Sequence, residues 1–519
     1  MSKLKKFGIF CVAILGLILM SSCDRSKQRQ IIPATPGKDS VGKKAGSENL
    51  RGKAAWDNFK KEWEAKGEVF DYKQVIPKPI PSEKNFAHIP MLKPLHEYKK
   101  KEDQTGVTPI NPKKHEQSKN LLKIEGLKGK SLPKLGQWNI GQPADLIAWQ
   151  EFFREQKGWS HPEEAGKPAA DVLLALGKFE PTMAKLTQAA KKRPLCRFDI
   201  KYEAHFGALL PHLSTYRNLV RSFTLRALAH LANDDPESAL ADIRMCLFLV
   251  ESIRDEPLLI SQLVRISCLQ MALQPVWEGL KGEDWNPEQL AVMEKQLAVI
   301  DLLEGYRISI LGEREFANLA IAQWHSNPKL MEEQLAPLDG EPTEVIDMAS
   351  SDWIYQNQVR LNEMHLKYSQ RVIDIKARRI HPDIGATFEA MIEARKAKPD
   401  YVLSSMLLPS VGKVATRIGF AQTAVDHARI ACLLEIQKLE HKKYPAQLTR
   451  LKAPVPNDPY TGKPYVYKPD PKGRYELYGV GRNQKDDGGQ LAMRGKDSVD
   501  YKAGDLLWSY SHTPQTNSP

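Results

Sequence analysis

Apolar side chains recur every three or four positions from Pro143 to about His441. This spacing is typical of successive α-helices that each bury one face. One example begins near Pro143, since proline favours the first turn of a helix. Its apolar stripe consists of Leu146, Trp149, Phe152 and Phe153. We therefore predict a mainly α protein whose helical core domain covers residues 143–415.

Two neighbouring helices are predicted on either side of the polar turn D-D-P-E, residues 234–237. The pair resembles one hairpin of the tetratricopeptide type. Small and apolar residues keep the spacing of that motif at Ala227, Ala239, Ile243 and Cys246. A shift by one repeat of about 34 residues brings Ser261 and Leu273 to the alanine positions, so the motif does not recur. The core is expected to be a helical bundle or a repeat-like helical array.

Capping-box patterns mark two further helix starts, because a short polar residue precedes Glu or Gln by three positions. The pairs are Ser160 with Glu163 and Asn286 with Gln289. We expect one helix to begin at each pair.

The pattern changes after the long helical run of residues 417–440. Short segments of alternating apolar and polar residues follow, separated by turn residues, which predicts strands. These segments are residues 464–469, 474–481 and 505–509. They predict a small C-terminal antiparallel β-sheet, so that residues 416–509 form an α+β module and residues 510–519 a disordered tail.

The N-terminus has the pattern of a secretory leader. The positive segment M-S-K-L-K-K precedes the apolar run F-G-I-F-C-V-A-I-L-G-L-I-L-M, which is short for a membrane span. L-M-S-S-C, which ends at Cys23, resembles the lipobox of bacterial lipoproteins, although Met20 stands where leucine is commonest. The resemblance implies removal of a signal peptide, residues 1–22, and lipidation of Cys23.

Two or three acyl chains on Cys23 anchor a protein stably to a membrane. We therefore expect an extracytoplasmic, membrane-anchored envelope protein. Its anchor can lie in either the inner or the outer membrane. An uncleaved N-terminal anchor is the alternative, and it also places the body of the protein outside the cytoplasm.

Two segments of different composition connect this leader to the helical core. Residues 23–55 are polar and rich in Lys, Ser, Gly and Pro, which predicts a flexible lipidated tether. Residues 56–142 begin with a short amphipathic helix and continue with closely spaced prolines and lysines. We interpret this part as an irregular arm that lies over another surface.

The net charge is +12, and the lysines are concentrated between Lys93 and Lys134. Neither stacking aromatic residues nor a binding motif accompanies them, so no nucleic-acid partner is expected. A solvated basic segment near anionic lipid or glycan fits this composition better.

Four cysteines follow Cys23 in the chain, namely Cys196, Cys246, Cys268 and Cys432. An oxidising compartment permits disulfides among them. The last three fall within apolar helical patterns, where a thiol behaves as a small hydrophobe, so we expect buried free thiols. The sequence shows no C-x-x-C motif and no Cys/His cluster that suggests a metal centre.

Linear motifs of common enzyme classes are absent, including H-E-x-x-H, G-x-S-x-G and the P-loop. The glycines at 479 and 481 lack the third glycine and the following helix of a dinucleotide site. His205 and His212 are interpreted as packed or surface histidines, because Pro211 interrupts a regular helix between them. We assign no catalytic residue and expect a non-enzymatic protein.

The C-terminal segments occur in a distinctive order after the long helix. They read K-K-Y-P-A-Q-L-T-R-L, N-D-P-Y-T-G-K-P-Y-V-Y, Y-E-L-Y-G-V-G-R-N-Q-K-D-D-G-G and G-D-L-L-W, within residues 420–509. This order resembles the C-terminal half of the major pseudopilins of type II secretion. In that family a helix packs on a small antiparallel sheet, and a loop between the last strands holds calcium.

The resemblance implies that Asn483 and Asp505 lie near calcium ligands. Asp486 and Asp487 add oxygen donors, and Gly488 and Gly489 permit the positive φ values that aim carbonyl groups inward. A plain polar turn and half of an acid–base pair remain alternative interpretations of the two aspartates. Pseudopilins lack a lipoprotein leader and a long preceding body, so assembly of this chain into a pilus is not expected.

Together these patterns predict a non-catalytic scaffold or interaction protein, linked to secretion or surface assembly. Its partners would be the membrane, through the lipid anchor, and an unknown envelope protein. An extracytoplasmic hydrolase with its site in the helical domain is the alternative. A deep polar cleft with converging acids and histidines would favour the hydrolase, and an apolar groove the scaffold.

Overall fold

The computed structural model describes residues 45–101, 106–126, 131–327, 329–331, 350–396, 398–470, 474–495 and 498–510. The expected signal peptide, the expected lipidation site Cys23 and the expected tether up to residue 44 lie outside the described residues. The tail beyond residue 510 lies outside them as well.

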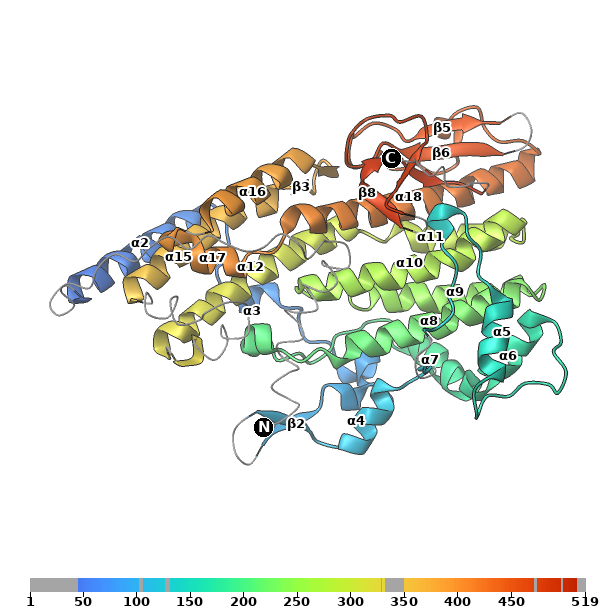
Figure 1. Ribbon diagram of the computed structural model, residues 1–519, viewed down its shortest axis with the longest axis horizontal. Coiled ribbons are helices and arrows are strands. Elements are labelled where there is room, and N and C mark those ends of the chain that lie inside the picture. Colours follow the sequence, from blue (N-terminus) through green and yellow to red (C-terminus); the bar gives the residue numbers. More distant parts are fainter. Residues whose placement is uncertain are drawn as a thin grey trace.

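Helices make up most of the described chain, and many of them lie along the long axis of the molecule (Figure 1). The long helices of the body are α8 (Pro211–Leu231), α10 (Leu259–Gly282), α12 (Leu302–Ser326) and α18 (Val411–His441). Beside them lie α9 (Pro236–Glu251), α11 (Pro287–Ala298), α15 (Ser351–Lys367), α16 (Pro382–Arg395) and α17 (Val402–Leu407). The predicted mainly α fold is confirmed.

Local sequence explains several helix starts. Asn286 and Gln289 form the predicted capping box, with Pro287 at the first position of α11. Asp235 caps α9 through the backbone N–H of Ser238, and α8 and α9 form the predicted helical hairpin.

The helix start predicted at Ser160 is wrong, because the next helix, α6 (Pro168–Leu176), begins only at Pro168. Arg154, at the end of α5 (Leu146–Arg154), donates to the carbonyl oxygens of Pro162 and Glu163 at 2.8 Å each. These contacts hold the intervening segment as a loop. Helix α7 (Glu180–Lys192) follows α6.

The N-terminal part of the described chain folds onto the helices. Helix α2 (Ala45–Ala65) packs against α15 and begins within the segment that was expected to be a tether. The next residues contain α3 (Tyr72–Val75), the hairpin β1 (Tyr98–Lys100) and β2 (Val107–Pro109), and α4 (Pro112–Lys119). Seven buried apolar side chains of the arm join the main core, namely Phe86, Ala87, Ile89, Leu92, Leu95, Leu122 and Trp138.

The C-terminal strands form small antiparallel sheets beside α18 (Figure 1). One sheet has the order β5 (Val466–Pro469), β6 (Tyr475–Gly479), β9 (Leu506–Trp508). A hairpin of β7 (Leu491–Met493) and β8 (Val499–Gly504) is inserted before β9. A two-residue pair, β3 (Ile373–Asp374) and β4 (Arg379–Ile380), lies before α16. The predicted small β module is confirmed, and the main apolar cluster continues through it.

Cys246, Cys268 and Cys432 are buried and unbridged, as predicted, and Cys196 is a free thiol that is partly buried. Burial raises the pKa of Cys268 to about 12, so this thiol stays protonated and behaves as an apolar group. Among the described residues, no helix is both long and apolar enough to cross a membrane.

Candidate functional site

The predicted aspartate loop lies between β6 and β7, and Asp505 immediately before β9 organises it. Asp505 is 0% exposed, and its Oδ2 accepts the backbone N–H of Asp487 at 3.1 Å and of Gly489 at 2.7 Å. Its other oxygen, Oδ1, is buried and has no hydrogen-bond partner. Burial raises the pKa of Asp505, while the two N–H donors oppose that rise.

The other predicted ligands approach Asp505 to different degrees. Asn483 Nδ2 donates to Asp487 Oδ2 at 2.7 Å, so these two side chains lie together. Asp486 instead accepts the hydroxyl of Tyr478 at 3.0 Å and the backbone N–H of Gly488 at 2.9 Å. Gly488 and Gly489 have φ values of +73° and +76°, in agreement with the expected backbone conformation.

The loop is therefore a preformed polar turn that holds one unpartnered carboxylate oxygen. The structure brings Asn483, Asp487 and Asp505 together and turns Asp486 toward Tyr478. An acid–base pair is not favoured by this geometry, because each carboxylate already accepts hydrogen bonds from the loop itself.

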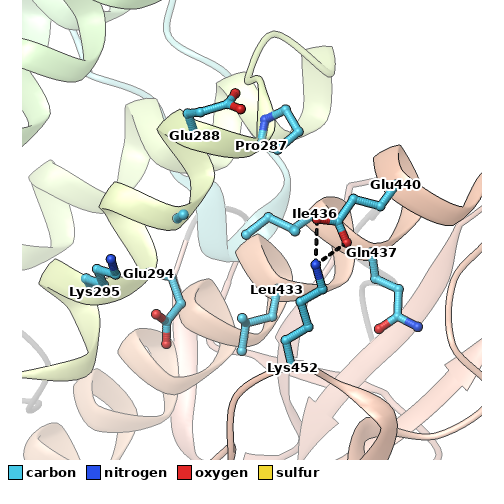
Figure 2. Close-up of a pocket in the computed structure, with 10 residues that line it drawn as sticks. Pro287, Glu288, Glu294, Lys295, Leu433, Ile436, Gln437, Glu440 and Lys452 are labelled. Atoms are coloured by element: carbon cyan, nitrogen blue, oxygen red, sulfur yellow. Dashed lines mark hydrogen bonds and ion pairs between the residues drawn. The ribbon is translucent and has the colours of Figure 1, made fainter.

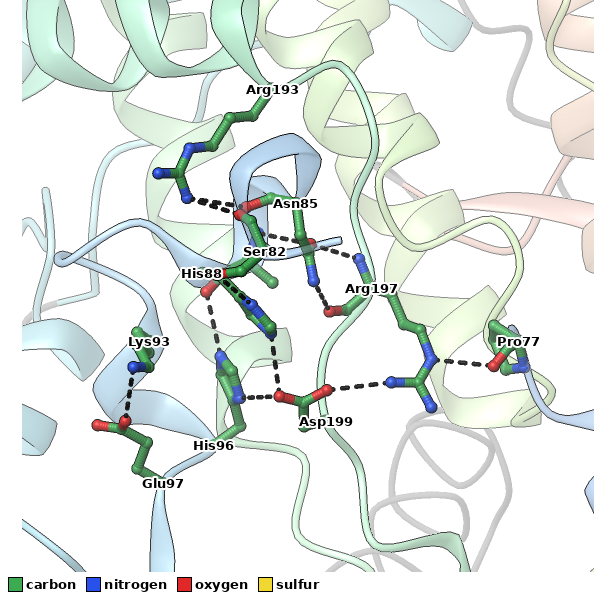
Figure 3. A network of polar contacts seen from close by, with 11 residues as sticks. Pro77, Ser82, Asn85, His88, Lys93, His96, Glu97, Arg193, Arg197 and Asp199 are labelled. Carbon is green, nitrogen blue, oxygen red and sulfur yellow. Dashed lines mark hydrogen bonds and ion pairs between the residues drawn. The ribbon is translucent and has the colours of Figure 1, made fainter. Parts of the chain in front are cut away.

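A second polar group, which sequence patterns did not reveal, joins the arm to the core (Figure 3). It consists of His88, His96 and Asp199. Within the described chain, it is the one group of three His, Cys, Asp or Glu side chains whose ligand atoms lie within 4.8 Å of one another. No linear motif links the three positions, since Asp199 lies far from the two histidines in sequence.

The buried histidines that the sequence did single out are structural. His212 Nε2 lies 2.8 Å from Glu256 Oε1, and His205 Nε2 lies 3.1 Å from Gln323 Oε1. The two rings are buried and have separate partners, so of the two interpretations, packed or surface histidines, the structure shows packed ones.

A surface groove of about 350 Å³ is lined by residues of α11, α18 and the segment that contains Lys452 (Figure 2). Its lining includes the apolar side chains of Leu433 and Ile436 and several charged side chains. Lys452 Nζ lies 2.6 Å from Glu440, so part of that charge is already paired. Its lining contains acids, lysines and apolar groups but no histidine. The groove therefore differs from the polar cleft of converging acids and histidines that would favour a hydrolase.

Comparison with protein-family models found no match, and comparisons with curated proteins and with solved structures found no significant one.

Proposed function

We propose that this chain is a lipid-anchored protein of the bacterial cell envelope with a non-catalytic scaffold or interaction role in secretion or surface assembly. The observation that carries the proposal is the leader, in which a basic segment, an apolar run and S-S-C follow one another up to Cys23. The thiol of Cys23 would carry a diacylglyceryl group, and its acyl chains would hold the protein on the membrane.

The described body supports an interaction role in two ways. Its apolar cluster extends through the arm, the long helices and the C-terminal sheet, which makes a large framework. The groove between α11 and α18 is lined by Leu433 and Ile436 together with charged side chains, and it offers a concave surface that a partner can contact.

The anchor is tested by labelling cells that express the full chain with palmitate. We expect Cys23→Ala to abolish acyl labelling and to leave the precursor unprocessed. Cys11→Ala is the matched control, because Cys11 lies within the apolar run and should leave labelling unchanged. Acyl labelling of the Cys23→Ala protein at the level of the natural chain would contradict the anchor.

The scaffold role is tested by co-purification from solubilised membranes. We expect a stoichiometric envelope protein to remain with the natural chain and with Cys11→Ala. If the chain is acylated but purifies without a partner, the proposed anchor is supported and the proposed scaffold role is refuted.

We also propose that the aspartate loop binds calcium, through Asp505 Oδ1 together with oxygens of Asp487 and Asn483. Calcium requires six to eight oxygen ligands in flexible geometry, and loop carbonyl groups and water would supply the remainder. The buried, unpartnered Oδ1 of Asp505 supports this proposal, because such an oxygen gains a partner when a cation binds.

If calcium binds the folded loop, millimolar calcium should raise the melting temperature relative to a chelator. Asp487→Asn with Asp505→Asn should remove that difference while changing the shape of the loop little. Asp500→Asn is the control, because Asp500 belongs to β8 and is only partly buried. Identical melting curves of the natural chain with calcium and with chelator would identify the loop as a plain turn.

A further inference from the structure

The arm and the core are fixed to each other by backbone contacts beside His88, His96 and Asp199. Phe86 N–H donates to the carbonyl oxygen of Leu195 at 2.7 Å. The Asn85 side chain accepts the N–H of Arg197 at 2.9 Å and donates to its carbonyl oxygen at 2.8 Å. The three side chains are thus brought together by a paired backbone, so their positions are set before any ion binds.

The distances among the three side chains suit a metal ion. His88 Nε2 lies 3.0 Å and His96 Nδ1 lies 3.4 Å from the same oxygen, Asp199 Oδ2 (Figure 3). In a tetrahedral zinc site with bonds of about 2.0–2.1 Å, neighbouring ligand atoms are about 3.3–3.4 Å apart. The two distances to Asp199 Oδ2 are close to that value, and the ligand atoms of the two histidines lie within 4.8 Å of each other.

A hydrogen bond determines which ring nitrogen of His96 carries the proton and which one is free to bind a metal ion. His96 Nε2 lies 3.1 Å from the carbonyl oxygen of Ala87, which can only accept, so Nε2 carries the proton. In the neutral ring, the lone pair of Nδ1 then faces a carboxylate oxygen. A cation between the two atoms would turn this unfavourable contact into a favourable one.

The remaining contacts resemble the outer shell of a metal site. His88 Nδ1 lies 3.1 Å from Ser82 Oγ, so both rings have an oxygen partner on the nitrogen that faces away from Asp199. Arg197 Nη1 donates to Asp199 Oδ1 at 3.0 Å and leaves Oδ2 for the ion. The positive charge of Arg197 lowers the affinity of the site but also orients the carboxylate.

Access to the cluster comes from the side of the carboxylate. The side chains of His88 and His96 are 16% and 7% exposed, whereas that of Asp199 is 44% exposed. An ion held by three protein atoms there would keep a coordination position open to water or to another ligand, as in sites with three protein ligands.

We propose that His88 Nε2, His96 Nδ1 and Asp199 Oδ2 bind one divalent metal ion of the zinc class, which cross-links the arm to the core. This site is independent of the lipid anchor and of the aspartate loop.

The test uses the full chain without an affinity tag, stripped of metal and titrated with Zn²⁺ against a chromophoric chelator. We expect one Zn²⁺ per chain at this site. His88→Ala, His96→Ala and Asp199→Asn should each weaken binding at least about tenfold, because loss of an outer-shell partner alone costs that much. Asp199→Asn is the variant least able to disturb folding, since its side chain is half-exposed.

His230→Ala is the matched control. His230 Nδ1 pairs with Asp235 Oδ2 at 3.3 Å, but no third ligand joins them among the described residues. This variant should bind Zn²⁺ like the natural chain, and so should Asp487→Asn in the aspartate loop. Undiminished Zn²⁺ binding in the three ligand variants, or none in the natural chain, would overturn the proposal.

A second measurement reports on the cross-link itself. Lys84 lies in the arm shortly before His88, so tryptic cleavage after Lys84 follows local opening of the arm. Zn²⁺ should slow this cleavage in the natural chain and in His230→Ala but not in Asp199→Asn. Equal cleavage of the natural chain with and without Zn²⁺ would refute the cross-link.

Discussion

Replacement of Arg314 by methionine is expected to destabilise the fold by about 3–5 kcal/mol at neutral pH, as removal of one partner from a buried ion pair does. Arg314 lies in α12 with a side chain that is 0% exposed. It donates to Glu315 Oε1 at 2.9 Å, to Glu68 Oε2 at 2.8 Å and to the carbonyl oxygen of Val69 at 2.6 Å. The substitution leaves the Glu315 carboxyl buried without its cation and detaches the segment that follows α2.

The loss should depend on pH. Burial raises the pKa of Glu315 to about 7, although Arg314 opposes that rise. The folded state therefore binds this proton more tightly than the unfolded state does. The protonated carboxyl of Glu315 therefore stabilises the fold at pH values below the ordinary glutamate pKa. This contribution is lost as pH rises through about 7. Without Arg314 the pKa of Glu315 rises further, so the cost of Arg314→Met should be larger at pH 8 than at pH 5.

Urea denaturation at the two pH values checks this expectation. Arg307→Met is the control on the same helix, because the Arg307–Glu304 pair has side chains that are 50% and 36% exposed. An exposed pair of this kind contributes about 0–1 kcal/mol. The double variant Arg314→Met, Glu315→Gln should recover part of the lost stability at pH 8. A cost that is equal at pH 5 and pH 8 would show that Glu315 is not the group left unpaired.

The sequence predicted those parts of the fold that local patterns determine. The capping box at Asn286, the hairpin around Asp235 and the strands of the C-terminal sheet all depend on neighbouring residues. The hairpin of β7 and β8 was missed because its strands, L-A-M and V-D-Y-K-A-G, are short and each contain only a few apolar residues. These strands are defined by contact with each other and with Ile140, which lies far away in the chain.

The two candidate sites also differ in whether their residues are close in sequence. The aspartate loop was visible because Asn483, Asp486 and Asp487 are close in sequence, and the resemblance to pseudopilins implied that Asp505 lies beside them. The His88, His96 and Asp199 cluster was not visible, because it exists only after the arm packs on the core. Arg314 likewise reads as part of the charged run E-R-E and becomes a buried ion-pair centre only through Glu68.

Replacement of Trp277 by alanine is expected to cost about 3–5 kcal/mol, as large-to-small changes of buried aromatic residues do. Trp277 lies in α10 and is 0% exposed. Its Nε1 donates to the carbonyl oxygen of Ser509 at 3.0 Å, and its ring stacks near Tyr510 with centroids 6.4 Å apart. The substitution leaves a cavity and also removes the donor that holds the end of the chain after β9.

Trp277→Phe separates these two effects. It keeps most of the ring surface and loses the donor, so a smaller cost of about 1 kcal/mol is expected. Urea denaturation followed by far-ultraviolet circular dichroism measures both variants. An equal cost for Trp277→Phe and Trp277→Ala would mean that the hydrogen bond, and not the packing, is the main contribution of this side chain.

The same variant tests how strongly the C-terminal sheet is coupled to the helices. Tyr510 accepts the N–H of Trp508 at 3.0 Å, and its hydroxyl lies 3.1 Å from that of Tyr475, so Trp277 contacts a polar and aromatic group shared by β6 and β9. Because one apolar cluster joins α10, α18 and the sheet, Trp277→Ala should lower a single cooperative transition. Hydrogen exchange should then show β6 and β9 losing protection together with α10. Loss of protection in β6 and β9 alone, with α10 unchanged, would instead show that residues 416–509 unfold as a separate unit.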